Sequence, residues 1–98
     1  MFRGTTPTHT FILPIEASLL TDAYITYAQH GSTKIEKRLS DCVRDDNKLV
    51  VVLSQLETLS LMANNLTEIQ VAAKVGGKVM RSQIISVPTE RILKDGEI

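Results

Sequence analysis

The sequence predicts an all-β protein, a small antiparallel β-sandwich of immunoglobulin-like type with about six or seven strands and one short helix. Short runs of β-branched and aromatic residues recur along the chain, and polar turn residues separate them. Two glycines, Gly76-Gly77, join two of these runs as the turn of a β-hairpin. With 98 residues, 43% of them hydrophobic, the chain is long enough to bury one core. We therefore expect a single domain over residues 1–98.

Four strands are expected in the N-terminal half, after a loose N-terminal arm at residues 1–7. Thr8–Leu13 is the first, because Thr, Phe and Ile suit a pleated surface and a proline follows them. Ala23–Gln29 is the second, and after a turn the chain returns as the third, Thr33–Leu39. Charged residues alternate along the third strand, which is typical of a sheet edge. Lys48–Leu53 is apolar on both faces and is typical of a central strand.

One short helix is expected after the fourth strand. Ser54-Gln-Leu-Glu57 matches a capping box, in which the serine and glutamate side chains each accept from the other's backbone N–H. We expect helical turns over Gln55–Leu61, with leucines closing one end of the core. The alternating patterns and this helix predict the following buried residues: Phe11, Leu13, Ile25, Leu49, Val51, Leu56, Ile69, Val71 and Ile84.

The hairpin consists of residues 67–75 and 78–87. A type I′ turn at Gly76-Gly77 needs positive φ at both glycines, which glycine adopts without strain. This turn sets the expected cross-strand pairs: Val75 with Lys78, Ala73 with Met80, Val71 with Ser82, and Ile69 with Ile84. Pro88 is expected to end the sheet, and residues 89–98 form a short C-terminal tail.

Composition argues against several classes of function. Lys plus Arg and Asp plus Glu both number 11, so the net charge is zero and neither a nucleic acid nor an anionic membrane is an expected partner. The longest apolar run, Leu49 to Leu53, is too short to span a bilayer. The start of the chain lacks the layout of a signal peptide. Cys42 is the only cysteine, which fits a reducing compartment. We also expect no cofactor.

The polar loop Ser40–Asn47 holds the residues that most resemble a catalytic or metal site. Cys42 lies among acidic neighbours, which oppose formation of the thiolate that a nucleophile needs. Asp41, Asp45 and Asp46 do not have the ligand spacing of an EF-hand loop. A semi-buried cysteine and a solvated turn are the expected roles.

No other motif indicates catalysis. His9 and His30 are far apart, and neither has a partner at metal-ligand spacing. Gly76-Gly77-Lys78 is not a phosphate-binding loop, because a strand follows it where that motif has a helix. We therefore predict no catalytic, cofactor-binding or metal-binding residues, and a protein that is not an enzyme.

Several stretches resemble small proteins encoded by phages and prophages of Gram-positive bacteria. The similar stretches are Arg3-Gly-Thr-Thr-Pro-Thr-His-Thr-Phe11, Ala23-Tyr-Ile-Thr-Tyr-Ala-Gln29, Leu53-Ser-Gln-Leu-Glu-Thr-Leu59 and Glu68-Ile-Gln-Val71. The resemblance implies an immunoglobulin-like or similar sandwich from a tail or other structural gene region. It transfers no active-site residue. A location in the bacterial host cytoplasm, in the virion, or in both follows from it.

The first functional hypothesis is a non-enzymatic phage structural or assembly protein that acts through protein–protein interaction. The alternative is a small-ligand or carbohydrate-binding module that uses an open sheet face, although aromatic residues are only 4% of the chain. Unpaired strand edges favour contact with another copy or with another structural protein, so a homo-oligomer is possible. The candidate interface residues are Tyr24 on the second strand and Ile92, Leu93 and Ile98 in the tail; a frayed tail remains open.

Overall fold

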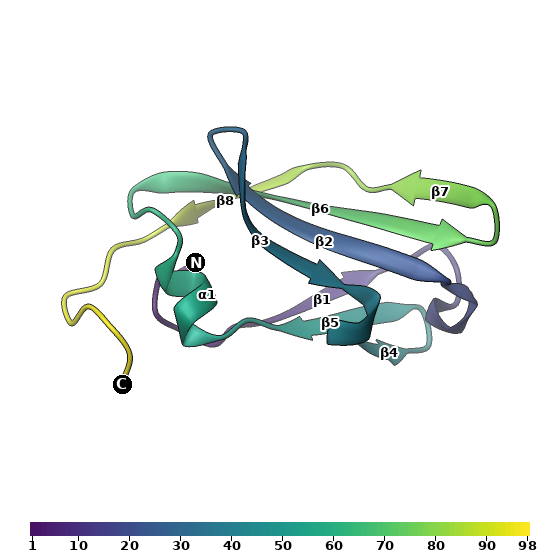
Figure 1. The fold of residues 1–98 in the computed structure, drawn as a ribbon, viewed down its shortest axis with the longest axis horizontal. Helices are drawn as coiled ribbons and strands as arrows, with labels where there is room; N and C mark the ends of the chain where they lie inside the picture. The colour runs from purple at the N-terminus through teal and green to yellow at the C-terminus, as the bar shows by residue number, and fades with distance from the viewer.

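The computed structural model describes residues 1–98 and confirms a small all-β sandwich of two antiparallel sheets with one short helix. Figure 1 shows the two layers facing each other, with the helix at one end. The smaller sheet has the order β1-β5-β4, and the larger has the order β3-β2-β6, with β7 and β8 both pairing with β6. The elements are β1 (Thr8–Ile12), β2 (Asp22–Gln29), β3 (Ser32–Arg38), β4 (Val43–Asp45), β5 (Lys48–Val52), α1 (Gln55–Leu59), β6 (Asn65–Val75), β7 (Lys78–Arg81) and β8 (Ile85–Thr89), with 3-10 turns at Ala17–Leu19 and Leu39–Asp41.

The structure has eight strands, two more than the six strand-like runs identified in the sequence. The loop Ser40–Asn47 contains the three-residue strand β4, which pairs with β5. The run 78–87 divides into β7 and β8. The expected edge position of the third strand is confirmed, since β3 pairs only with β2, and β5 is central in the smaller sheet.

The core lies between the inner faces of β2, β5 and β6. Period-2 burial is clear on β2, where Ala23, Ile25 and Tyr27 are buried and the residues between them are not. Six of the predicted core residues are buried: Leu13, Ile25, Leu49, Val51, Ile69 and Val71. Phe11 is half-buried and packs against this core.

Ile84 was predicted to be buried but is 56% exposed, and the reason is a shift in register. The pairs Val75–Lys78 and Ala73–Met80 are as predicted. Further along, however, Ile69 pairs with Ile85 rather than Ile84. One additional residue is therefore accommodated between β7 and β8, and a shift of one residue moves a side chain to the opposite face of a sheet.

Pro88 does not end the sheet, contrary to expectation. It lies within β8 opposite Leu66, and the strand continues to Thr89. Its carbonyl faces outward and accepts from the amino group of Met1 at 2.6 Å. Proline is tolerated here because an outward-facing edge position needs no ladder N–H.

The type I′ prediction at the glycine pair is also wrong. Only Gly76 has a positive φ, 59°, as at the first central position of a type II′ turn. The β2–β3 turn instead has positive φ at both central residues, 52° at His30 and 75° at Gly31, which is the type I′ pattern. Both turn types match the twist of a hairpin, so the hairpin prediction itself holds.

The predicted capping box is present at α1. The Glu57 N–H donates to Ser54 Oγ at 3.1 Å, and the Ser54 N–H donates to Glu57 Oε1 at 2.8 Å. The helix ends at Leu59, and Leu56 is 64% exposed rather than buried. Thr58 faces inward instead, because its hydroxyl donates to the Thr5 carbonyl at 2.8 Å and accepts from the Thr5 N–H at 3.0 Å.

The N-terminal arm is hydrogen-bonded rather than loose. The Glu90 N–H donates to the Met1 carbonyl at 2.8 Å, and Phe2 forms a parallel bridge with Glu90. The Arg3 guanidinium donates to the carbonyls of Leu61 at 2.7 Å and Leu59 at 2.9 Å. These bonds fasten the arm across the end of the sandwich beside α1.

Candidate functional site

Most edges of the two sheets carry a feature that discourages pairing with another chain. β4 is only three residues long, and Arg44 and Asp45 are charged. β7 is four residues long, and both Lys78 and Arg81 are cationic. β8 contains a proline and is partly covered by the N-terminal arm. β3 is charged at Lys34, Glu36, Lys37 and Arg38. Short length, charge, proline and cover are the usual means by which proteins protect sheet edges.

β1 has none of these features. Its sequence, Thr-His-Thr-Phe-Ile, contains no Lys, Arg, Asp, Glu or proline, and its pairing with β5 has no bulge. It pairs with β5 on one side only, so its other side is a free edge. Among the edges of this sandwich, β1 is therefore the one most open to pairing with a further strand.

Three residues of β1 present free backbone groups. At the two ends of the ladder, Leu53 N–H donates to the Pro7 carbonyl at 3.0 Å and Leu13 N–H donates to the Asn47 carbonyl at 2.7 Å. Hydrogen-bonded pairs alternate along an antiparallel ladder, so the odd-numbered residues bond to β5 and the even-numbered ones face away from it. The N–H and C=O groups of Thr8, Thr10 and Ile12 thus make up what we call the β1 edge. No turn or side-chain hydrogen bond uses them.

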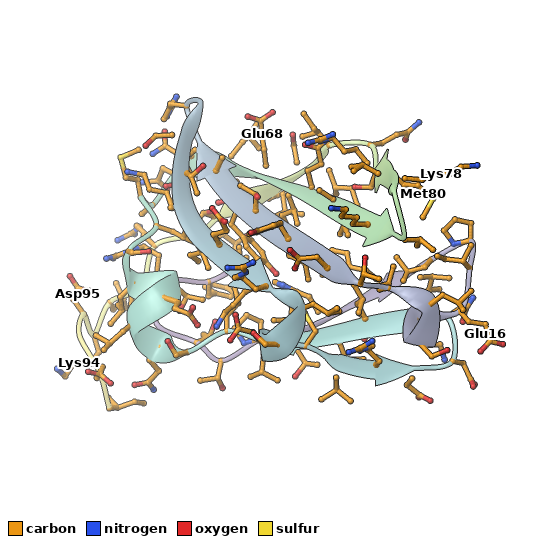
Figure 2. The ribbon with its side chains drawn as sticks, turned by 45° about the vertical axis from the view of Figure 1, so that its right-hand side comes forward. Glu16, Glu68, Lys78, Met80, Lys94 and Asp95 are labelled. Atoms are coloured by element: carbon orange, nitrogen blue, oxygen red, sulfur yellow. The ribbon has the colours of Figure 1, made fainter.

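A groove of about 550 Å³ runs beside the β1 edge, between the two sheets. We call it the edge groove; its lining residues are Thr10, Phe11, Ile12, Leu13, Pro14, Val71, Ala73, Met80, Arg81, Ser82 and Ile85. Most of these residues are hydrophobic, and Arg81 is the single charged one. Figure 2 shows Lys78 beside Met80, both on β7. β1 and β7 are outer strands of the two sheets, and the groove lies between them.

His9 holds β1 against the larger sheet. Its Nδ1 is hydrogen-bonded to the hydroxyl of Tyr27 at 2.7 Å, and the two rings stack with centroids 5.6 Å apart. Burial lowers the pKa of His9, and the charge of the N-terminal amine lowers it further. Burial raises the pKa of Tyr27. Both groups are therefore neutral near pH 7, and the pair fixes the position of β1 without bringing a charge into the core.

The remaining titratable candidates lie apart from the groove. Cys42 is half-buried, and its Sγ donates to the Arg38 carbonyl at 3.4 Å. Burial raises the pKa of this thiol, and Asp41 adds to the effect, so the thiolate is disfavoured. His30 lies in an exposed turn and hydrogen-bonds Asn65. No three His, Cys, Asp or Glu side chains lie close enough together to hold a metal ion.

The four predicted interface residues do not form one surface. Tyr24 is half-buried on β2, and the Arg38 guanidinium lies 4.8 Å from its ring centroid. Ile92 is half-buried, close to Gly4 on the N-terminal arm. Leu93 and Ile98 are 91% and 93% exposed.

Sequence reasoning did not single out the β1 edge, although a signal was present. Thr8–Leu13 is one of two predicted strands that lack a charged residue, the other being Ala23–Gln29. That absence becomes informative only when β1 is known to be an edge, and strand order came from the structure.

Comparisons of the chain with protein-family models, with curated protein sequences and with solved structures gave no match. None of the helices has the length and apolar character needed to cross a membrane.

Proposed function

We propose that this protein is a non-enzymatic structural or assembly protein that binds another polypeptide as an additional strand along the β1 edge. One observation carries the proposal: the unprotected edge and the apolar edge groove lie side by side. In strand addition, main-chain hydrogen bonds provide affinity, and pockets for alternate side chains provide specificity. This site offers both parts.

The proposed contact implies a definite position for the partner strand. It continues the smaller sheet and pairs with Thr8, Thr10 and Ile12. Every second side chain then points inward, over Val71 and Ala73 on β6. Uncharged and mainly apolar side chains are expected at these alternate positions, since the groove is lined mainly by hydrophobic residues.

A phage or prophage structural protein of a Gram-positive bacterium, working in the virion or in the host cytoplasm, would use this kind of contact. The support for that origin is the resemblance of the four sequence stretches. Mass spectrometry of purified induced phage particles tests it: we expect the chain in stoichiometric amounts in the particle or in its assembly intermediates. Its absence from both would refute the phage assignment while leaving the edge contact to be tested separately.

The test of strand addition is hydrogen–deuterium exchange of the full-length protein with a capped heptapeptide of alternating valine and threonine. We expect the amides of Thr8, Thr10 and Ile12 to become protected. Thr10→Pro removes an outward N–H without removing a bond to β5, and we expect it to abolish the protection. Val52→Lys is the matched control, because Val52 is on the same sheet but not at its edge. Binding without protection of these amides would show that the edge is not the site.

A small apolar ligand is the second candidate function. The groove volume of about 550 Å³ is within the range of small-molecule pockets, and Arg81 is positioned to pair with an acidic group on the ligand. Such a ligand would shift the methyl resonances of Val71, Ala73 and Met80 and leave the edge amides exchanging freely. A carbohydrate is less suited, since Tyr24 is partly covered by Arg38.

A further inference from the structure

We infer that the partner strand at the β1 edge is β1 of a second copy of this chain, paired antiparallel about a two-fold axis at Thr10. The inference rests on the proposed function, because it names the partner for the same edge. Three observations support it. The backbone groups of the β1 edge are complementary to those of the same edge on a second copy, and its side chains carry no charge. The other sheet edges are poorly suited to pairing with themselves.

The backbone of the β1 edge is self-complementary. A two-fold axis that places Thr10 opposite Thr10 of the second copy also places Thr8 opposite Ile12. These are the residues whose N–H and C=O groups face outward. Residues opposite each other at hydrogen-bonded positions exchange both N–H···O=C bonds, so each outward group finds a partner. The same surface patch is used by both copies, as in most homodimers.

The side chains also fit this register. On the outer face, Thr8, Thr10 and Ile12 are uncharged and β-branched, and such residues form favourable cross-strand pairs. On the inner face, His9 lies opposite Phe11 of the second copy. Since His9 is neutral near pH 7, no like charges meet across the axis. Ile12, which is 73% exposed in the single chain, becomes flanked by a threonine of the second copy.

The other free edges lack this complementarity. Pairing two β7 strands brings Lys78 and Arg81 of both copies together with no acidic residue on the strand to compensate. The C-terminal tail is a poor donor for the groove. Leu93 and Ile98 are five residues apart and point to opposite faces of an extended strand, and Asp95 shares the face of Leu93. The tail also leaves the sandwich at the α1 end, away from the β6–β7 hairpin (Figure 1).

The size of the contact predicts a weak dimer. Only five residues of each copy pair. This is a short contact, since stable interfaces bury about 1,200–2,000 Å² of surface in total. The zero net charge adds no long-range repulsion between copies. We therefore expect a dimer that forms reversibly and increases with protein concentration.

Disulfide trapping tests the register directly, in the full chain with Cys42→Ser. In the proposed dimer the two Cα atoms of residue 10 lie about 5.5 Å apart, within the range that a disulfide spans. We expect Thr10→Cys to form a covalent dimer in a glutathione buffer. Thr8→Cys alone is expected to link poorly, because it lies opposite Ile12, and the double variant Thr8→Cys with Ile12→Cys is expected to link well. Val79→Cys, an exposed position on the β7 edge, measures random collision.

Sedimentation equilibrium over a wide concentration range tests the dimer without a covalent bond. We expect the mass of the wild type to rise towards twice 10.8 kDa. Thr10→Lys places two cations on the axis and should keep the chain monomeric, whereas Val43→Lys, on the same outer face but on β4, should not. Monomeric wild type at the highest concentration, or Thr10→Cys linking no faster than Val79→Cys, would overturn the inference. Protection of the edge amides by the valine–threonine peptide would then still support strand addition, with a foreign partner.

Discussion

Replacing Gln29 with methionine should destabilise the fold more than the loss of one polar side chain suggests. Gln29 is fully buried at the end of β2. Its Nε2 donates to the Met62 carbonyl at 3.0 Å and to Thr67 Oγ1 at 3.2 Å, and its Oε1 accepts from the Met62 N–H at 2.7 Å. The amide therefore fastens the connection between α1 and β6 to the larger sheet. Methionine has a similar length but none of these bonding groups.

The magnitude follows from these three hydrogen bonds. Each contributes about 0.5–1.5 kcal/mol to stability, and we take about 1 kcal/mol for each of the three. We expect Gln29→Met to lower the free energy of unfolding by about 3 kcal/mol. For a chain of this size that corresponds to a fall in Tm of about 12–24 °C.

Urea denaturation followed by far-UV circular dichroism measures this change. Gln83→Met is the matched control: Gln83 is exposed in the segment between β7 and β8, its side chain makes no hydrogen bond, and we expect a change below about 0.5 kcal/mol. The m-value should not change, because the surface exposed on unfolding stays the same. If Gln29→Met unfolds at the same urea concentration as wild type, the buried amide does not stabilise this connection and the reasoning is wrong.

Three further predictions concern the core, the arm and pH. Ile25→Ala, at a fully buried position, should cost about 2–5 kcal/mol by urea denaturation, whereas Leu56→Ala, largely exposed, should cost less than about 0.5 kcal/mol. Gly4→Ala should cost about 1–2 kcal/mol, because φ is +68° and a Cβ would lie 3.0 Å from Ile92 Cδ1; Gly77→Ala, in open space without a positive φ, should be nearly neutral in the same assay. Folding lowers the pKa of His9, so the unfolded chain binds more protons: stability should be complete above about pH 6.5 and should fall as the pH drops toward the folded pKa. If the urea midpoint stays constant across that pH range, or if His9→Asn keeps the same dependence on pH, the prediction for His9 is wrong.

Short-range patterns determined most of the secondary structure. The alternation on β2 and β5, the capping box of Ser54 and Glu57, and the first pairs beside Gly76-Gly77 follow from residues close together in the sequence. Such features depend on periodicity, side-chain-to-backbone bonds and turn length, and the sequence displays each of these directly. The fold class follows from them because several short amphipathic strands must bury their apolar faces against each other.

Long-range contacts determined the rest. The register shift that exposes Ile84 arises between β7 and β8, beyond the first pairs of the hairpin, and it cannot be inferred from the turn alone. Gln29 reads as a polar strand end, and only the arrival of the chain at Met62, 33 residues later, makes it a buried anchor. The same holds for the candidate site: the uncharged residues of β1 are ordinary in a central strand, and they become a binding edge because the tertiary fold pairs β1 on one side only and leaves a groove beside the other. Which edge stays free depends on the packing of whole sheets, and no local pattern in the sequence encodes it.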